Sequence, residues 1–206
     1  MLLNIEHCIF FLISYLICSI PFGLAIGKIV GNIDIRKKGS GNIGATNVAR
    51  LIGKKWGALT FILDGMKGGI MVIIAKKFDP SYYHEHFLAF VVLFCILGNI
   101  FPIYLKFKGG KGVATTMICL LFFNKLIGLS ALFLWVITFI FTKTSSTASL
   151  LSIFFATAIA MQYTGKISSI LMVTICILIF LRHKDNIINL INGTEKKFDK
   201  KNAKKR

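Results

Sequence analysis

Residues 87–105 read FLAFVVLFCILGNIFPIYL and contain no charged side chain. A run of this length and composition can cross a bilayer as a helix. Similar runs recur along the whole chain, which has 206 residues, of which 55% are hydrophobic. The sequence therefore predicts an all-α integral membrane protein with one polytopic domain over residues 1–206.

Hydropathy divides the chain into seven expected transmembrane helices. Merging residues 113–141 into one helix is the alternative, and the charge distribution decides against it. With seven spans, the N-terminus lies outside, and the C-terminus lies in the cytoplasm with the loops that hold 20 of the 25 Lys and Arg residues. A merged helix would place the basic tail opposite the first loop, against the positive-inside rule. Residues 196–206 form a basic tail that we expect to be disordered. The expected spans are 8–28, 57–75, 87–105, 112–123, 126–141, 147–162 and 167–181.

The formal net charge is +17. In a soluble protein this excess would suggest nucleic acid, but here it lies between apolar runs, so topology explains it and no nucleic-acid partner is expected. All five cysteines lie inside apolar runs, and no CxxC pair is present. We therefore expect neither a disulfide nor a metal site, and no cofactor.

The loop that follows the first span reads GSGNIGATNVAR over residues 39–50. Glycines let the backbone approach a ligand, and successive N–H groups with hydroxyl and amide side chains can form an anion site. The loop also matches GxGxxG, with Asp64 about twenty residues on. That match is spurious, because no strand precedes it and Asp64 falls inside an apolar run. The alternative to an anion site is a plain polar connection between helices.

A second basic glycine loop spans residues 106–116, KFKGGKGVATT. It leads directly into an expected helix, whose N-terminus favours anions. The spacing does not match a P-loop, because Gly112 follows Lys111. The two loops are expected on one side of the membrane, where together they predict a phosphate-binding site.

Three further groups carry polar chemistry. Asp64 and Lys67 are three residues apart, so they share a helix face and can pair; the pair either fixes helix packing or contacts a ligand. Residues 182–186, RHKDN, follow the last span. His183 in this segment is a candidate base, or a candidate donor of a hydrogen bond to a phosphate. Residues 146–149, STAS, open the sixth span with hydroxyls on the same side.

Two absences narrow the chemistry. No His is followed five residues later by Asp, so the HxxxxD dyad of thioester-using acyltransferases is missing. There is also no cluster of Asp residues that would hold a divalent metal for phosphatidyl transfer.

From Tyr15 to Glu195 these motifs, in this order, resemble the bacterial acyl-phosphate-dependent glycerol-3-phosphate acyltransferases (the PlsY family). Three places depart from the family's pattern: Asn99 stands where the family usually has a His, and Lys143 and Asn189 stand where Arg is expected. Asn99 cannot titrate. The matching segments are residues 19–23 (SIPFG), 39–50, 64–68 (DGMKG), 108–115 (KGGKGVAT), 146–149 and 182–195.

The resemblance implies transfer of an acyl group from acyl phosphate to the 1-hydroxyl of sn-glycerol 3-phosphate, at the cytoplasmic face of the bacterial plasma membrane. The implied partners are these two substrates and membrane lipid, and the basic face would suit docking of the phosphate acyltransferase that makes acyl phosphate. The residues expected to act in catalysis are Ser40, Lys111, His183 and Asn186. Those expected to bind substrate are Gly41, Asn42, Gly44, Thr46, Asn47, Arg50, Asp64, Lys67, Lys108, Gly109, Gly110, Gly112, Ser146, Ser149 and Arg182.

A transporter for an organic phosphate is the alternative from another class, because it would also use glycine-broken segments and intramembrane charges. The spans show no inverted repeat, and the polar residues gather at one surface rather than at the midplane. A structural membrane scaffold is the third reading, and it leaves the glycine loops unexplained.

Overall fold

In the computed structural model, residues 4–78 and 84–198 are described, and every regular element among them is a helix. The predicted all-α fold is therefore confirmed. The elements are α1 (Ile5–Cys18), α2 (Phe22–Gly31), the 3₁₀ helix η1 (Ile35–Lys37), α3 (Ala45–Leu51), α4 (Lys54–Phe78), α5 (His84–Ile100), the 3₁₀ helix η2 (Ile103–Leu105), α6 (Val113–Phe123), α7 (Lys125–Thr142), α8 (Ser145–Tyr163), α9 (Lys166–Arg182) and α10 (Lys184–Ile191).

Five helical segments of the described chain are long and apolar enough to cross a membrane, and a sixth is gained if α9 and α10, which meet at 63°, form one span. The shorter apolar helix α6 lies where the fourth span is expected. Seven spans and the orientation of the termini remain predictions. The five segments are Ile5–Gly31, Lys54–Phe78, Glu85–Leu105, Lys125–Thr142 and Ser145–Tyr163.

Residues 113–141 form two helices rather than one merged helix. Asn124 separates α6 from α7, and its side-chain oxygen accepts hydrogen bonds from the amides of Leu126 and Ile127 at 3.0 and 3.4 Å. An asparagine at this position caps the new helix and satisfies its orphan amides. The two helices then pack closely, because Gly128 lies against the backbone of Leu121.

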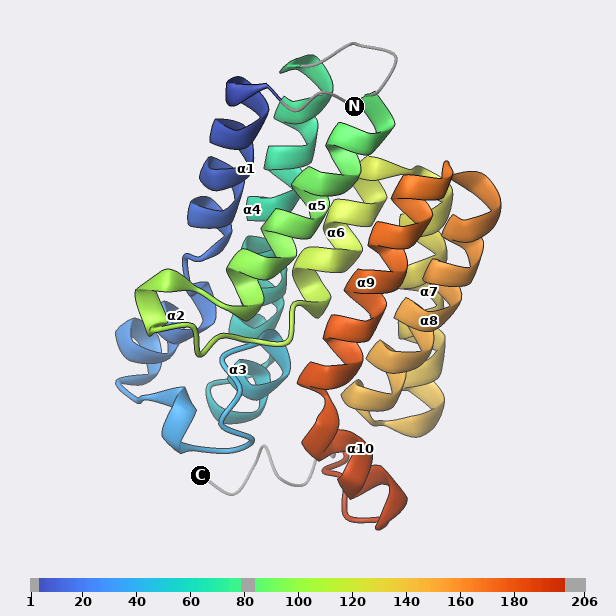
Figure 1. Ribbon diagram of the computed structural model, residues 1–206. Helices are drawn as coiled ribbons and strands as arrows, with labels where there is room; N and C mark the ends of the chain where they lie inside the picture. The colour runs from blue at the N-terminus through green and yellow to red at the C-terminus, as the bar shows by residue number, and fades with distance from the viewer. Residues whose placement is uncertain (1–3, 79–83, 199–206) are drawn as a thin grey trace.

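The bundle is organised around α5, which packs against α1, α4, α6 and α9 (Figure 1). Phe87 and Ile96 of α5 are fully buried, as is Met117 of α6. By contrast α7 lies at the rim, where large apolar side chains such as Leu129 and Phe141 are exposed. This pattern places a packed core inside the bundle and leaves an apolar outer surface that suits lipid.

Both glycine loops lie at one end of the bundle, at the bottom of Figure 1, together with α10. This end, formed by residues 32–53, 101–112 and 183–198, is called the loop end below. The chain enters it where α1 stops at Cys18 and restarts as α2 at Phe22. The expectation that the two loops share one side of the protein is therefore confirmed.

Candidate active site

Asn47 holds the first glycine loop in shape. Its side chain is 1% exposed, and its Oδ1 accepts a 2.9 Å hydrogen bond from the Ser40 amide. Its Nδ2 donates to the carbonyl oxygens of Ile35 and Lys38 at 3.0 and 3.2 Å. Gly39 adopts a φ of 66°, and a Cβ there would collide with Asn47 Oδ1. The polar atoms of Asn47 are thus engaged with the loop backbone, so this residue shapes the site instead of offering free donors to a substrate.

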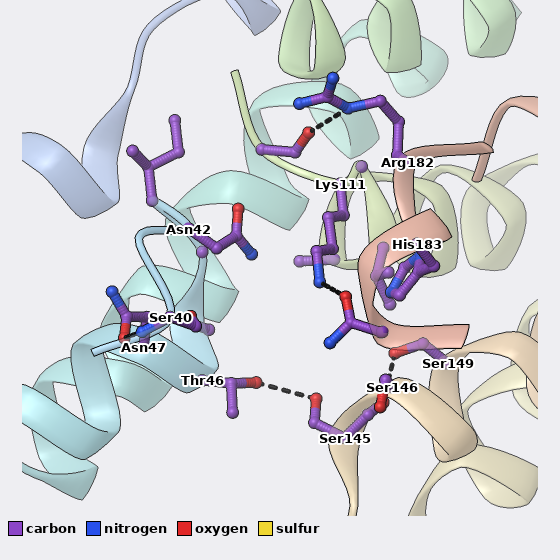
Figure 2. A pocket seen from close by; sticks show the side chains of 18 of the residues that line it. Ser40, Asn42, Thr46, Asn47, Lys111, Ser145, Ser146, Ser149, Arg182 and His183 are labelled. Atoms are coloured by element: carbon purple, nitrogen blue, oxygen red, sulfur yellow. Dashed lines mark hydrogen bonds between the residues drawn. The ribbon is translucent and has the colours of Figure 1, made fainter. Parts of the chain in front are cut away.

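The same loop presents three side chains to a cavity at the loop end. Ser40, Asn42 and Arg50 line this cavity, and no described residue forms a hydrogen bond with the side chain of any of them. Figure 2 shows the Asn42 amide pointing toward Lys111, with Ser40 on the same loop. Hydroxyl, amide and guanidinium groups are donors that suit a phosphate.

The second glycine loop folds back on the end of α5. The Gly109 amide donates to the Ile100 carbonyl at 3.2 Å, and the Gly110 amide donates to the Asn99 carbonyl at 3.1 Å. A Cβ at Gly109 would collide with both of these carbonyl groups. From the other side, the Arg182 guanidinium donates to the carbonyl oxygens of Gly109 and Gly110 at 3.2 and 3.4 Å. Glycine is required here because two backbone segments approach each other closely.

A chain of hydrogen bonds runs from Lys111 of this loop to α8. Lys111 Nζ donates to Asn186 Oδ1, and Asn186 Nδ2 donates to Glu195 Oε1 at 2.6 Å. Ser146 Oγ donates to the same carboxylate oxygen at 2.7 Å. The structure thus joins Lys111, Ser146 and Asn186, all three predicted, through Glu195, which was not among the predicted site residues.

A second contact at the cavity joins α3 to α8. The hydroxyls of Thr46 on α3 and Ser145 on α8 lie 2.9 Å apart (Figure 2). Ser149 donates to the Ser145 carbonyl at 2.7 Å and accepts from the Trp135 indole at 3.1 Å. Ser149 is therefore occupied by the protein, whereas Thr46 and Ser145 form a contact that a ligand could replace.

The cavity has a volume of about 320 Å³. All but four of the predicted site residues line it; Gly41, Lys67, Lys108 and Gly109 do not. Gly41 forms the turn of the first loop, Lys67 pairs with Asp64 at 2.8 Å, and Lys108 is exposed outside the cavity. The lining also includes polar and aromatic residues that were not predicted: Phe61, Asn99, Trp135, Ser145, Asp185, Asn189, Glu195 and Lys196.

Burial controls the charges at the centre of the cavity. It lowers the pKa of Lys111 to about 8, an effect that the carboxylates of Glu195 and Asp185 partly oppose. Burial also lowers the pKa of His183 to about 4, and Lys111 adds to this shift. His183 is 2% exposed, and its Nδ1 lies 2.8 Å from the Ile179 carbonyl. A carbonyl only accepts, so Nδ1 carries the proton and Nε2 keeps a free lone pair.

The scaffolding role of Asn47 gives a first prediction. Replacing Asn47 with alanine removes the partner of the buried Ile35 carbonyl and of the Ser40 amide, while the Lys38 carbonyl keeps the Gly41 amide, so we expect a loss of about 1–3 kcal/mol of stability. Thermal unfolding in detergent measures this loss, and Asn192→Ala, at an exposed asparagine, is the matched control. An unchanged melting temperature in Asn47→Ala would contradict the assigned role.

The fold and cavity together define a class: a polytopic helical membrane protein with a polar, donor-rich cavity at one end of the bundle. The comparison with known families is more specific. The glycerol-3-phosphate acyltransferase family model matches residues 8–193, and this chain belongs to that family.

Individual relatives agree with this assignment. The chain is 45% identical over 194 residues to the glycerol-3-phosphate acyltransferase of Wolbachia sp. subsp. Brugia malayi (strain TRS), covering 94% of this chain and 99% of the relative. It is 40% identical over 193 residues to the enzyme of Ehrlichia ruminantium (strain Gardel), covering 94% and 97% of the two chains.

Two crystal structures share the fold. Both are of PlsY (YgiH), an integral membrane glycerol 3-phosphate acyltransferase, and both are 33% identical to this chain. The glycerol 3-phosphate form superposes with a TM-score of 0.90 over 98% of this chain and all of that chain. The lysophosphatidic acid form gives 0.85 over 96% and 98% of the two chains.

Proposed function

We propose that this protein transfers an acyl group from acyl phosphate to the 1-hydroxyl of sn-glycerol 3-phosphate, giving 1-acyl-sn-glycerol 3-phosphate and inorganic phosphate. The family membership and the two ligand forms of the related structures support the acceptor and the acylated product. The observation that carries the proposal is the pair of donor-rich walls that face each other across Lys111.

The two walls suit two phosphate groups. On one side Ser40, Asn42 and Arg50 offer donors that no described residue occupies by hydrogen bonding. On the other side Ser146 and Asn186 donate to the Glu195 carboxylate, and a phosphate would take these donors by displacing that carboxylate. Both proposed substrates carry a phosphate, and charge-assisted hydrogen bonds of these kinds bind phosphate strongly.

The acyl group needs an apolar exit from the same cavity. Phe61 of α4, Val113 and Ala114 of α6, and Trp135 of α7 line one part of it. Of these helices, α4 and α7 expose apolar side chains such as Leu59 and Val136, which suit lipid. An acyl chain could therefore leave the polar site between helices and remain in the apolar layer.

The reaction requires no covalent acyl-enzyme, because acyl phosphate is a mixed anhydride with a good leaving group. The glycerol hydroxyl oxygen attacks the acyl carbonyl carbon, a C–O ester bond forms, and the C–O bond to phosphate breaks. The hydroxyl proton passes either to His183 Nε2 or to the departing phosphate. Lys111 would stabilise the negative charge that develops on the carbonyl and phosphate oxygens.

The distribution of Lys and Arg residues supports one orientation of the protein in the membrane. We propose that the loop end faces the cytoplasm of a bacterial plasma membrane, since positive residues gather there. Both substrates would then reach the site from that side. The phosphate acyltransferase that produces acyl phosphate would dock on the same basic face.

The direct test measures release of inorganic phosphate from palmitoyl phosphate by the purified protein, with and without glycerol 3-phosphate. Lysophosphatidate is followed by mass spectrometry, and palmitoyl-CoA serves as the parallel donor. We expect phosphate release to depend on glycerol 3-phosphate and to match product formation, with no product from palmitoyl-CoA. Saturable uptake of glycerol 3-phosphate into proteoliposomes, without turnover of any donor, would identify a transporter.

A separate prediction concerns the proton acceptor. If His183 Nε2 takes the hydroxyl proton, His183→Gln lowers kcat by about 10²–10⁴-fold, the range for general-base catalysis. The variant must keep the wild-type melting temperature, because His183 is buried. A folded His183→Gln protein with nearly full kcat would assign the proton to the departing phosphate.

A further inference from the structure

A second cavity lies outside the site, on the lipid-facing side of α1 and α5. It has a volume of about 600 Å³ and shares no lining residue with the first cavity. Its walls are apolar and come from two neighbouring helices that run side by side (Figure 1). The residues are Cys8, Phe11, Leu12 and Tyr15 of α1, Phe90, Phe94 and Leu97 of α5, and Phe101 and Phe107 beyond α5. This cavity is called the α1–α5 groove.

The groove has the shape of a slot for an extended chain. The spacing of 90, 94, 97 and 101 follows one helix face, and at 1.5 Å per residue it covers about 16 Å. This length is close to the roughly 15 Å depth of the hydrocarbon layer of one leaflet. Near the loop end the Tyr15 hydroxyl donates to the Phe101 carbonyl at 2.6 Å, so this tyrosine hydroxyl is satisfied although it borders the apolar space.

The mouth of the groove is basic. Phe107 lines it and is flanked by Lys106 and Lys108, both exposed. Lys106 and Phe107 have φ values of 51° and 62°, a conformation that side chains rarely adopt, and three backbone hydrogen bonds to Pro102, Ile103 and Leu105 hold this turn. No acidic residue occurs between 101 and 112. Two exposed lysines therefore flank, in the sequence, the residue that lines this end of the groove.

We propose that the α1–α5 groove binds one acyl chain of an anionic phospholipid, with the headgroup phosphate held by Lys106 and Lys108. An apolar slot ending at two lysines matches a lipid with an apolar chain and a negative headgroup. A second copy of this protein fits the groove less well. If two copies were related by a twofold axis along the membrane normal, Lys106 and Lys108 of one copy would lie against the same lysines of the other, and like charges repel. The groove also gives Lys108, which lies outside the active-site cavity, a phosphate to bind.

This lipid would stabilise the wall of the active site. Phe101 lines the groove, and the Arg182 guanidinium lies over the Phe101 ring, 5.9 Å from its centroid. Arg182 in turn holds the second glycine loop through Gly109 and Gly110. A lipid chain packed against Phe101 therefore supports the loop that carries Lys111.

The test titrates the purified full-length protein with palmitoyl-oleoyl phosphatidylglycerol or phosphatidylcholine and counts bound lipid by native mass spectrometry. We expect phosphatidylglycerol to bind about 25-fold more tightly, since each of the two lysines near an anionic headgroup contributes a factor of about five. Lys106→Gln/Lys108→Gln should bring it to the level of phosphatidylcholine. The control Lys54→Gln/Lys55→Gln removes the same charge from exposed lysines elsewhere and should keep the preference.

A second pair of variants tests the groove itself. Leu12→Trp fills it, and we expect about tenfold weaker binding of phosphatidylglycerol. Leu129→Trp is the matched control, because Leu12 and Leu129 are 56% and 57% exposed and only Leu12 lines the groove. Equal binding of the two lipids, or equal behaviour of the two tryptophan variants, would each overturn the proposal.

Discussion

Replacing Lys111 with alanine is expected to lower kcat for acyl transfer by about 10²–10³-fold, the usual cost of losing one group that stabilises a developing oxyanion. Lys111 Nζ lies in the cavity between the two donor walls, and its hydrogen bond to Asn186 fixes its direction. The measurement is release of phosphate from palmitoyl phosphate at saturating glycerol 3-phosphate. Lys54→Ala, at an exposed lysine outside the cavity, is the control for charge alone. A Lys111→Ala protein with wild-type kcat would remove this residue from the mechanism.

The pH dependence tests the same side chain independently. The pKa of Lys111 is lowered to about 8, so its charge is present below that pH and is lost as the pH rises through it. We expect kcat/KM for glycerol 3-phosphate to fall above about pH 8. His183, with a pKa of about 4, stays neutral from pH 5 upward. Its titration should therefore not change kcat/KM in that range.

Two variants assign that alkaline limb. Lys111→Arg keeps its charge at all accessible pH values, so the fall above pH 8 should disappear even if the rate is lower. Glu195→Gln removes a carboxylate that raises the pKa of Lys111, so the fall should begin at a lower pH. An unchanged alkaline limb in Lys111→Arg would assign it to another group.

The two glycine loops could be predicted because the glycines and polar residues that mark each loop are close together in the sequence. Glycines at 39 and 112 adopt positive φ, and such positions are recognisable from composition alone. Lys111 could be predicted as a site residue because it lies in a glycine loop directly before an expected helix. The break between α6 and α7 could also be predicted. With two helices in residues 113–141, the basic tail is expected on the same side of the membrane as the basic loops. With one merged helix it would be expected on the opposite side.

The roles of single residues within the site could not be predicted in the same way. Asn47 and Ser40 are neighbours in one loop, but the fold turns Asn47 inward to bond the backbone at Ile35 and leaves Ser40 without a side-chain partner. Glu195 belongs to a segment that matches the family. Its position beside Ser146 depends on the 63° bend between α9 and α10 and on the path of the chain after α10, which local sequence does not encode.

Replacing Lys67 with alanine is expected to destabilise the protein by about 3–5 kcal/mol, the typical cost of breaking a buried ion pair from one side. Lys67 Nζ donates to Asp64 Oδ1 and to the Ile20 carbonyl, both at 2.8 Å. That carbonyl lies at the break between α1 and α2, where Pro21 disfavours a helical conformation of the residue before it. Without Lys67, the buried Asp64 carboxylate and the partly buried Ile20 carbonyl would both lose this partner.

A double variant separates packing from ligand binding, the two interpretations that the sequence leaves open for this pair. Asp64→Asn/Lys67→Met removes both charges, and we expect its melting temperature to recover most of the loss, since replacing a whole buried pair by neutral groups costs little. Thermal unfolding in detergent gives the stability, and glycerol 3-phosphate-dependent phosphate release gives kcat/KM. Asp64 lines the cavity whereas Lys67 does not. Recovery of stability with recovery of kcat/KM therefore identifies a packing pair. Recovery of stability with kcat/KM still low shows that the Asp64 carboxylate acts on the substrate, and a Lys67→Ala protein as stable as wild type contradicts the structural role of Lys67.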